Sequence, residues 1–195
     1  MVSITNNTDA DERLTARSLL MKYMKPTDQT PRIDIRKATP ADQQAIWSVN
    51  RAGWQAYSHI FTSDEVNRVF THGASLYASW VQYRGPNLDT LVAVTVTDQQ
   101  VVGFVSTALL WGKPDGEITA LYILPEYQGF GLGRRLWRHG IDNLKGHNCP
   151  MAWVWVLARA PAVAFYEHMG CVRVATGSYQ VDDHTEMAYG YRLSL

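Results

Sequence analysis

The stretch LYILPEYQGFGLGRRLWRHG, residues 121–140, combines two features that are each unfavourable for an isolated helix. Glycines alternate at positions 129, 131 and 133, and glycine loses more conformational entropy on folding than any other residue. Arginines follow at positions 134, 135 and 138, where cations oppose the positive end of the helix dipole. A bound anion offsets both costs, because clustered backbone N–H groups and arginines bind phosphate. The stretch therefore predicts a phosphate-binding loop that leads into a helix.

The segments on either side of this loop predict a fold of the α/β (α+β) class. Apolar runs that suit strands alternate with segments that suit helices, which indicates a mixed sheet with helices on both faces. Upstream, we expect strands over 33–36 and 116–124, a hairpin over 88–110, and helices after Thr39 and over 63–70. Downstream, we expect helices over 132–146 and 160–170, a strand over 151–158 and two strands over 171–193.

Two parts of different composition are expected. Residues 1–31 are mostly polar, with a weak apolar stripe between about residues 9 and 24, which predicts an appended helix or a frayed tail. Residues 32–195 carry the regular alternation of elements and are predicted to form the main domain.

Composition and charge exclude several classes of function. Eighteen basic residues balance eighteen acidic ones, which argues against a nucleic-acid partner bound by broad electrostatic attraction. The apolar run at 151–158 is too short to cross a bilayer, and the six histidines lack metal-ligand spacing. Cys149 and Cys171 form no CxxC pair, so we expect free thiols. These observations favour a cytoplasmic protein with no signal peptide, membrane segment or metal.

Three motifs in order resemble the Gcn5-related N-acetyltransferase (GNAT) superfamily. QGFGLG at 128–133 fits its Q/R-x-x-G-x-G/A signature, and LYILPEYQ at 121–128 resembles its L-Y-V-x-P-x-x-Q segment. ARAPAVAFYEHMGC at 158–171 resembles its N-x-x-A-x-x-F-Y-E-x-x-G-F segment. The resemblance extends over about residues 33–193. It implies a mostly antiparallel sheet whose two central strands splay into a V-shaped slot for acetyl-CoA (coenzyme A).

The resemblance also implies how this cofactor is held. The glycine loop and the helix start bind the pyrophosphate, while the preceding strand pairs with the pantetheine arm and polarises the thioester carbonyl. The implied cofactor-binding residues are Leu121, Tyr122, Ile123, Gln128, Gly129, Phe130, Gly131, Leu132, Gly133, Arg134, Arg159 and Phe165. Arg159 departs from the pattern, because the family often has asparagine there. It could reach an acceptor carboxylate or the CoA 3′-phosphate, or lie on the surface.

Two residues are implied as catalytic. Tyr166 matches the family's tyrosine that donates a proton to the leaving thiolate; the alternative is a core tyrosine. Glu117, four residues before Leu121, matches the glutamate that serves as a base in histone-type members. The alternative for Glu117 is an exposed carboxylate at a strand end.

The expected activity is transfer of an acetyl group from acetyl-CoA directly to a primary amine, more readily that of a small molecule. Trp54 and Tyr57 lie three residues apart and are predicted to form an aromatic wall for the acceptor, or to be ordinary core residues. Trp153 and Trp155 are predicted to be structural. A non-catalytic acyl-CoA-binding module, a protein N-terminal or lysine acetyltransferase, and a homodimer remain open alternatives.

Overall fold

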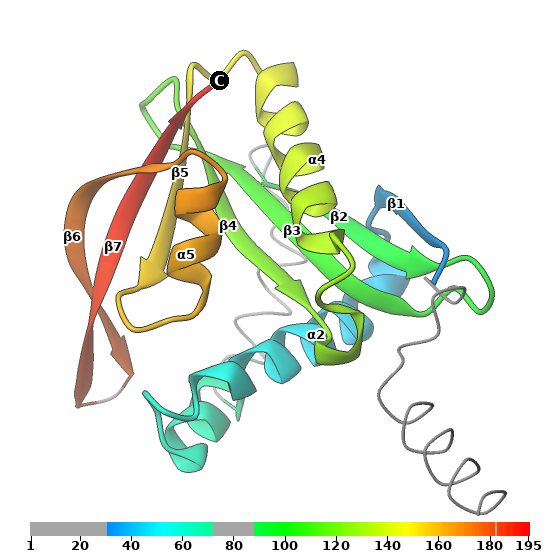
Figure 1. Ribbon diagram of the computed structural model, residues 1–195, viewed down its shortest axis with the longest axis horizontal. Helices are drawn as coiled ribbons and strands as arrows, with labels where there is room; N and C mark the ends of the chain where they lie inside the picture. Colours follow the sequence, from blue (N-terminus) through cyan, green and yellow to red (C-terminus); the bar gives the residue numbers. More distant parts are fainter. Residues whose placement is uncertain (1–30, 72–87, 182) are drawn as a thin grey trace, which may run out of the picture. The chain divides into compact units, whose positions relative to one another are not determined.

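The computed structural model describes residues 31–71, 88–181 and 183–195 (Figure 1). Its centre is a seven-stranded sheet with the strand order β1-β2-β3-β4-β5-β7-β6. The strands are β1 (Ile33–Lys37), β2 (Leu88–Thr95), β3 (Val101–Leu109), β4 (Gly116–Ile123), β5 (Met151–Leu157), β6 (Val172–Val181) and β7 (His184–Ser194). The predicted extension over residues 1–31 lies outside the described residues except for Pro31.

The sheet is antiparallel except between its two central strands. β4 and β5 are parallel, and they pair only at Gly116 with Ala152 and at Glu117 with Trp153. Beyond Glu117 the two strands separate, so the edge of β4 that faces β5 has no pairing strand from the described part of the chain. This separation confirms the predicted splay of the central strands.

An irregularity in β4 lies just beyond the point of separation. Ser106 of β3 pairs with Ala120, but its neighbour Thr107 pairs with Ile118. Thr119 is therefore an extra residue, and its hydroxyl donates a hydrogen bond to the Ser106 carbonyl at 3.2 Å. Such bulges bend a strand and increase its twist, which turns the second half of β4 away from β5.

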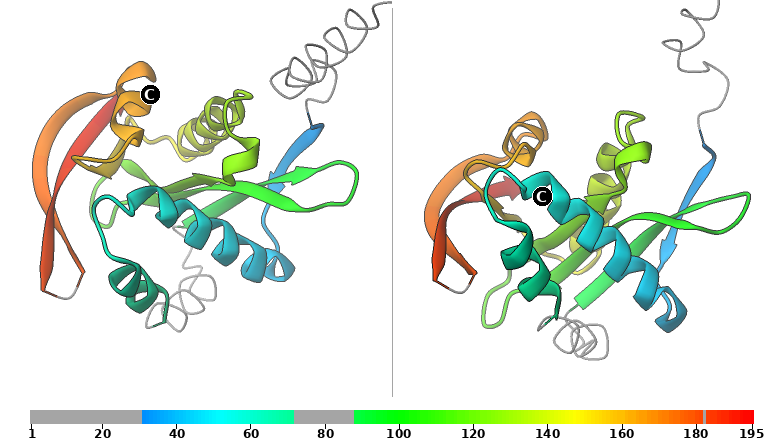
Figure 2. Two further views of the ribbon diagram at one scale, coloured as in Figure 1. Left: turned by 60° about the horizontal axis from the view of Figure 1, so that its bottom comes forward. Right: turned by 90° about the horizontal axis from the view of Figure 1, so that it is seen from below.

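Helices cover both faces of the sheet, as predicted (Figure 2). Helix α2 (Gln43–Trp54) packs on one face of the first half of the sheet, whereas α4 (Leu132–Gly146) packs on the other. Every residue of β3 from Val101 to Thr107 is buried, as expected for a strand with both faces covered. A capping box at Thr39 and Asp42, with Arg36 paired to Asp42, orders the entry to α2.

The second half of the sheet carries the short helix α5 (Ala162–His168), which contacts α4 through the ring of Trp137. Residues 63–71 are also helical, in agreement with the predicted helix near 63–70. The 3₁₀ turns are η1 (Pro40–Asp42), η2 (Gln55–Tyr57) and η3 (Pro125–Tyr127). Among the described helices, none has the length and apolar character needed to span a membrane.

Candidate active site

The glycine loop joins the end of β4 to the start of α4. Gly129 has φ 83° and Gly131 has φ 77°, both in the left-handed region that favours glycine. Gly131 is the N-cap of α4, and a Cβ added there would meet no atom within 4 Å. The loop therefore requires glycine for its backbone conformation, although there is open space where a side chain at position 131 would project.

Gln128 fixes this loop to the strand before it. Its side-chain Nε2 donates a hydrogen bond of 2.9 Å to the carbonyl of Ile123, the last residue of β4. The backbone N–H of Leu124 donates to the Val102 carbonyl at 2.9 Å. Together these bonds fix the segment between β4 and α4 to the end of β4 and to β3.

A cavity of about 520 Å³, which we call the loop cavity, lies beside this loop. It is lined by Gly53, Ala56, Tyr57, Leu121, Tyr122, Ile123, Gln128, Gly129, Gly131, Gly133, Arg134, Pro161, Ala162, Phe165, Tyr166, His168 and Met169. The charged or titratable groups at its polar end are Arg134 and His168, whose side chains are hydrogen-bonded at 3.1 Å. A helix N-terminus beside a guanidinium makes this end suited to an anion.

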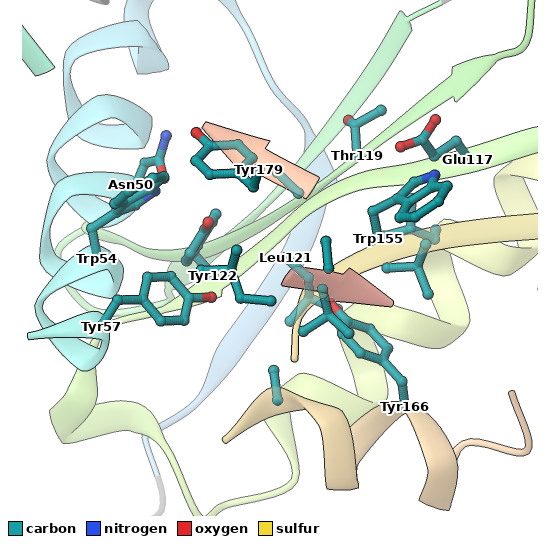
Figure 3. Close-up of a pocket in the computed structure, with 17 residues that line it drawn as sticks. Asn50, Trp54, Tyr57, Glu117, Thr119, Leu121, Tyr122, Trp155, Tyr166 and Tyr179 are labelled. Carbon is teal, nitrogen blue, oxygen red and sulfur yellow. The ribbon is translucent and has the colours of Figure 1, made fainter. Parts of the chain in front are cut away.

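A second cavity of about 380 Å³, which we call the aromatic cavity, lies where β4 and β5 separate (Figure 3). Its aromatic lining consists of Trp54, Tyr57, Tyr122, Trp155, Tyr166 and Tyr179. The remaining lining residues are Asn50, Glu117, Ile118, Thr119, Ala120, Leu121, Val154, Val156, Leu157, Ala162 and Ala188. The two cavities share Tyr57, Leu121, Tyr122, Ala162 and Tyr166, so they meet at the splay.

Tyr166 lies at this junction. It is the buried residue of α5, and its ring packs against those of Trp137 and Phe165 at centroid distances of 5.7 Å and 5.4 Å. Burial, followed by the nearby Tyr57 and Cys171, raises the pKa of its phenol well above the ordinary value. The phenol therefore stays protonated at neutral pH and can act as a donor.

Three further tyrosines surround the junction. Tyr57 follows α2, Tyr122 projects from β4 and Tyr179 from β6, and all three line the aromatic cavity. Burial raises the pKa of Tyr57, while a hydrogen-bonding interaction with Tyr122 lowers it in part. Burial also raises the pKa of Tyr122 and of Tyr179. The cavity thus presents neutral hydroxyls rather than phenolates.

Glu117 lines the aromatic cavity beside Trp155 and Thr119, where the pairing of β4 with β5 stops. The side chain is half-buried, and it makes no hydrogen bond or ion pair within the described part of the chain. Burial raises the pKa of its carboxyl group above the usual value. A carboxylate with a raised pKa beside a cavity is suited to accept a proton.

The structure brings most of the predicted site residues together. Leu121, Tyr122, Ile123, Gln128, Gly129, Gly131, Gly133, Arg134 and Phe165 line the loop cavity, and Trp54, Tyr57 and Glu117 line the aromatic cavity. Phe130, Leu132 and Arg159 line neither cavity. Leu132 is buried in the core under α4, and Phe130 is exposed on the loop.

The guanidinium of Arg159 instead forms a bidentate ion pair with Glu186 of β7. Arg135, which follows Arg134 in the basic run, donates a hydrogen bond to the carbonyl of Ile33 at 2.8 Å. Of these arginines, Arg134 is the one that lines the loop cavity. Assignment of Arg159 to the cofactor stays a prediction from the resemblance.

Three residues of the aromatic cavity were not anticipated as site residues. Asn50 lies one turn before Trp54 on α2, Tyr179 comes from the edge strand β6, and Trp155, expected to be structural, is 44% exposed. Of these, only Asn50 carries a usable signal in the sequence, because positions i and i+4 share a helix face. The positions of Tyr179 and Trp155 depend on strand pairing distant in sequence.

Comparisons with known proteins agree with this architecture. The model of the acetyltransferase (GNAT) family matches residues 54–171. The uncharacterized N-acetyltransferase YuaI of Bacillus subtilis (strain 168) is 26% identical over 153 residues, which cover 76% of this chain and 86% of that protein. A mycothiol acetyltransferase of Renibacterium salmoninarum is 30% identical over 171 residues, which cover 85% of this chain but only 45% of that protein.

Among solved structures, the PaiA N-acetyltransferase of Thermoplasma acidophilum in complex with coenzyme A has a TM-score of 0.64 at 16% identity. The match covers 84% of this chain and 99% of that one. At this identity the likeness concerns the fold. The family model spans more than half of the chain, and the chain therefore belongs to the GNAT family of acetyltransferases.

Proposed function

We propose that the protein transfers an acetyl group from acetyl-CoA directly to the primary amine of a small molecule. The observation that carries this proposal is the meeting of two chemically different cavities at Tyr166. One cavity suits an anionic donor substrate, and the other carries a carboxylate that can accept a proton. A coenzyme A complex of a protein with the same fold supports the choice of donor.

The residues of the loop cavity fit acetyl-CoA. The open backbone at Gly131, the start of α4 and Arg134 suit the pyrophosphate. The edge of β4 that lacks a pairing strand suits an extended amide chain, which would add to it as a strand does. Backbone N–H groups on the same edge would stabilise negative charge that develops on the thioester oxygen.

The aromatic cavity fits the proton transfers that the reaction needs. An amine attacks only in its neutral form, and Glu117 can take the proton that it loses, directly or through water. The N–C bond forms as the C–S bond breaks, and the sulfur leaves as a thiolate. Tyr166 lies between the cavities with its phenol protonated, so it can donate a proton to that thiolate.

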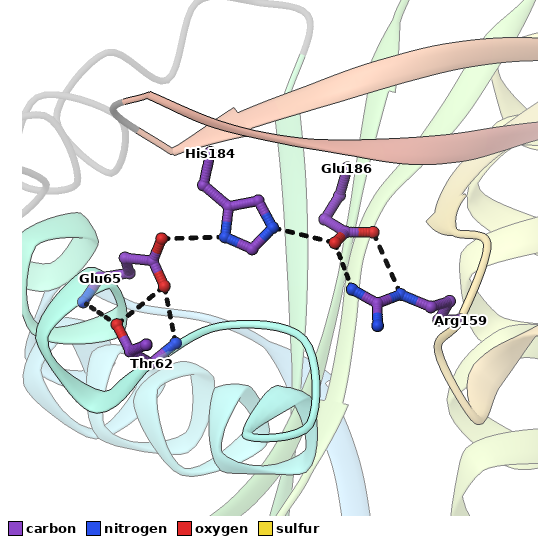
Figure 4. Close-up of polar contacts among 5 residues, drawn as sticks. All are labelled: Thr62, Glu65, Arg159, His184 and Glu186. Carbon is purple, nitrogen blue, oxygen red and sulfur yellow. Dashed lines mark hydrogen bonds and ion pairs between the residues drawn. The ribbon is translucent and has the colours of Figure 1, made fainter.

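A small acceptor is favoured because polar contacts, which we call the His184 bridge, link β7 to the segment after α2 (Figure 4). His184, at the start of β7, bonds to Glu65 and to Glu186 at 2.9 Å each, and Glu186 holds Arg159. Aromatic contacts reinforce the bridge, since Tyr179 lies 5.9 Å from Trp54 between ring centroids. The β6–β7 hairpin is thereby fastened to the segment after α2, which leaves less room for a polypeptide.

The direct test is release of free thiol from acetyl-CoA with a panel of amines, paired with calorimetric titration of CoA. We expect CoA binding and amine-dependent thiol release, with product of the added acetyl mass. Binding without turnover across the whole panel would support an acyl-CoA-binding module instead. Turnover restricted to peptides would support a protein acetyltransferase.

A further inference from the structure

The charges along the splay are segregated between the two cavities. The loop cavity carries the guanidinium of Arg134, which donates a hydrogen bond to the imidazole of His168. Among the described residues that line the aromatic cavity, Glu117 is the one formally charged group, and no lysine, arginine or histidine lies there. A ligand in the aromatic cavity therefore meets a carboxylate and no compensating cation.

Arg159, the guanidinium that could have received an acceptor's carboxylate, is engaged elsewhere. Its Nε and Nη2 both donate hydrogen bonds to the Glu186 carboxylate, which also accepts a hydrogen bond from His184. Releasing Arg159 would leave Glu186 with one partner fewer. An anionic group on the acceptor would thus enter a cavity that offers it repulsion from Glu117 and no ion pair.

Trp155 provides a flat apolar wall for the body of the acceptor. Its indole lies against two glycines of the neighbouring strands, since a Cβ on Gly177 or on Gly190 would come within 3.0 Å of the ring. Because neither glycine has a side chain, the indole ring of Trp155 packs directly on the backbone of the neighbouring strands. The indole remains 44% exposed and lines the cavity, so it can receive a flat group or a cation.

Asn50 provides a hydrogen-bond acceptor on the opposite wall. Its side-chain Oδ1 is buried and has no hydrogen-bond partner among the described residues. Figure 3 shows Asn50 on α2 beside Tyr179 and Trp54. A buried polar atom without a partner is costly. Because Asn50 lines the aromatic cavity, rotation of its amide would let a donor group on a bound ligand satisfy this oxygen.

We infer that the acceptor is a primary amine with a flat apolar body, at least one further hydrogen-bond donor and no anionic group. The amine lies toward Glu117, the flat body lies against Trp155, and the second donor reaches Asn50. This inference rests on the proposed function. The cavity volume of about 380 Å³ falls in the range of small-molecule sites.

Tryptamine and tryptophan form the matched pair that tests the charge requirement, because they differ only in the carboxylate. We expect kcat/KM for tryptamine to exceed that for tryptophan by about a hundredfold or more, in line with the cost of juxtaposed like charges. Calorimetric titration of both compounds into the CoA-loaded protein measures the same preference without turnover. Equal or better binding and turnover of tryptophan would overturn the inference.

Two substitutions test the roles of Trp155 and Asn50 as walls of the aromatic cavity. Trp155→Ala should weaken tryptamine binding by about tenfold or more, whereas Trp111→Ala should leave it unchanged, because Trp111 is 91% exposed and lines neither cavity. Asn50→Leu should weaken tryptamine more than 2-(1-naphthyl)ethylamine, which lacks the indole N–H. Equal losses for the two amines would contradict the role of Asn50.

The outcomes separate this inference from the proposed function. If CoA fails to bind and no amine releases thiol, the proposed function fails. If thiol release is robust but anionic amines are preferred, the acceptor class is wrong while the acetyltransferase activity stands. CoA titration of Trp155→Ala should match that of the unaltered protein, which shows that its donor site is intact.

Discussion

Gly53 of α2 lies directly against the ring of Tyr122 on β4. A Cβ built on Gly53 would come 2.3 Å from Cδ1 of Tyr122, far inside van der Waals contact. The absence of a side chain thus lets α2 approach the sheet at the point where the two cavities meet. Since Tyr122 lines both cavities, the packing of this helix and the shape of the site are set by the same contact.

Gly53→Ala should therefore destabilise the protein. The added methyl group forces the ring or the helix to move, which typically costs about 1–3 kcal/mol, more than the gain of about 0.5–1 kcal/mol from helix propensity. Gly146→Ala is the matched control, because a Cβ on Gly146, at the end of α4, meets nothing within 4 Å. Urea unfolding should show a lower midpoint for the first variant and an unchanged or higher one for the second. Equal midpoints would contradict the contact.

Gly131→Val should abolish CoA binding while the fold persists. Gly131 has φ 77°, so any side chain is strained there; it lines the loop cavity, and an added Cβ would project into open space. Gly112→Val separates strain from ligand exclusion, since Gly112 has φ 68°, meets nothing within 4 Å and lines neither cavity. Both variants should lose similar stability, and only Gly131→Val should lose CoA affinity in calorimetry. Retained affinity would mean that the loop does not hold the pyrophosphate.

Tyr166→Phe should lower turnover by about 10²–10⁴, the usual effect of removing a general acid. CoA affinity should change little, because the hydroxyl acts mainly as charge develops on sulfur. Tyr191→Phe is the control of the same chemistry. Its hydroxyl donates a 2.9 Å hydrogen bond to Glu167 and lines neither cavity, so its loss should affect stability and spare turnover. Near-normal turnover of Tyr166→Phe would assign the proton to water or another group.

The sequence was sufficient to predict the features whose residues lie close together along the chain. The loop at 128–133, the helix that follows it and Tyr166 on α5 are close in sequence, and so are the residues that identify them. The acceptor side was harder to foresee. Trp155 becomes a cavity wall only because Gly177 and Gly190 lie under its ring, and that depends on the register of β5 with β7 and of β7 with β6. The engagement of Arg159 by Glu186 likewise joins residues 27 positions apart.

The bridge at His184 should make stability depend on pH. Hydrogen bonds to Glu186 and Glu65 raise the pKa of His184, although its burial opposes them. A raised histidine pKa contributes stability that is fully present below about pH 6.5 and is lost as the pH rises through the raised value. The stability lost in His184→Gln should therefore be largest near pH 6 and shrink at alkaline pH.

His139→Gln, on the exposed side of α4, is the control for this bridge. The measurement is the urea midpoint of each variant at several values between about pH 6 and pH 10. Among the described residues, Glu65 and Glu186 are the charged groups that bond to His184, and Arg159 is bound to Glu186. A difference between His184→Gln and the unaltered protein that stays constant across this range would show that the bridge is not ionic.

Glu117→Gln should change activity and stability in opposite directions. Burial without a partner raises the pKa of the Glu117 carboxyl group, so ionising it near neutral pH costs folding free energy. For a carboxyl group whose pKa is raised in the folded state, stability falls as the pH rises from about 4.5 through the raised value. Glutamine cannot ionise and keeps the shape of the side chain. The variant should therefore unfold at a higher urea concentration than the unaltered protein at pH 7, with a difference that vanishes near pH 4.

The same substitution should remove a base from the reaction. Turnover of the unaltered protein should rise with pH as Glu117 ionises. The pH–rate profile of Glu117→Gln should lack this rise, and its turnover rate should be lower by about 10²-fold. Glu126→Gln is the control, because Glu126 is exposed in η3 and lines neither cavity. If Glu117→Gln is more stable but fully active, water is the base, and the role of Glu117 is limited to selecting the charge of the acceptor. A loss of both would show that the carboxylate has a structural partner in the folded protein.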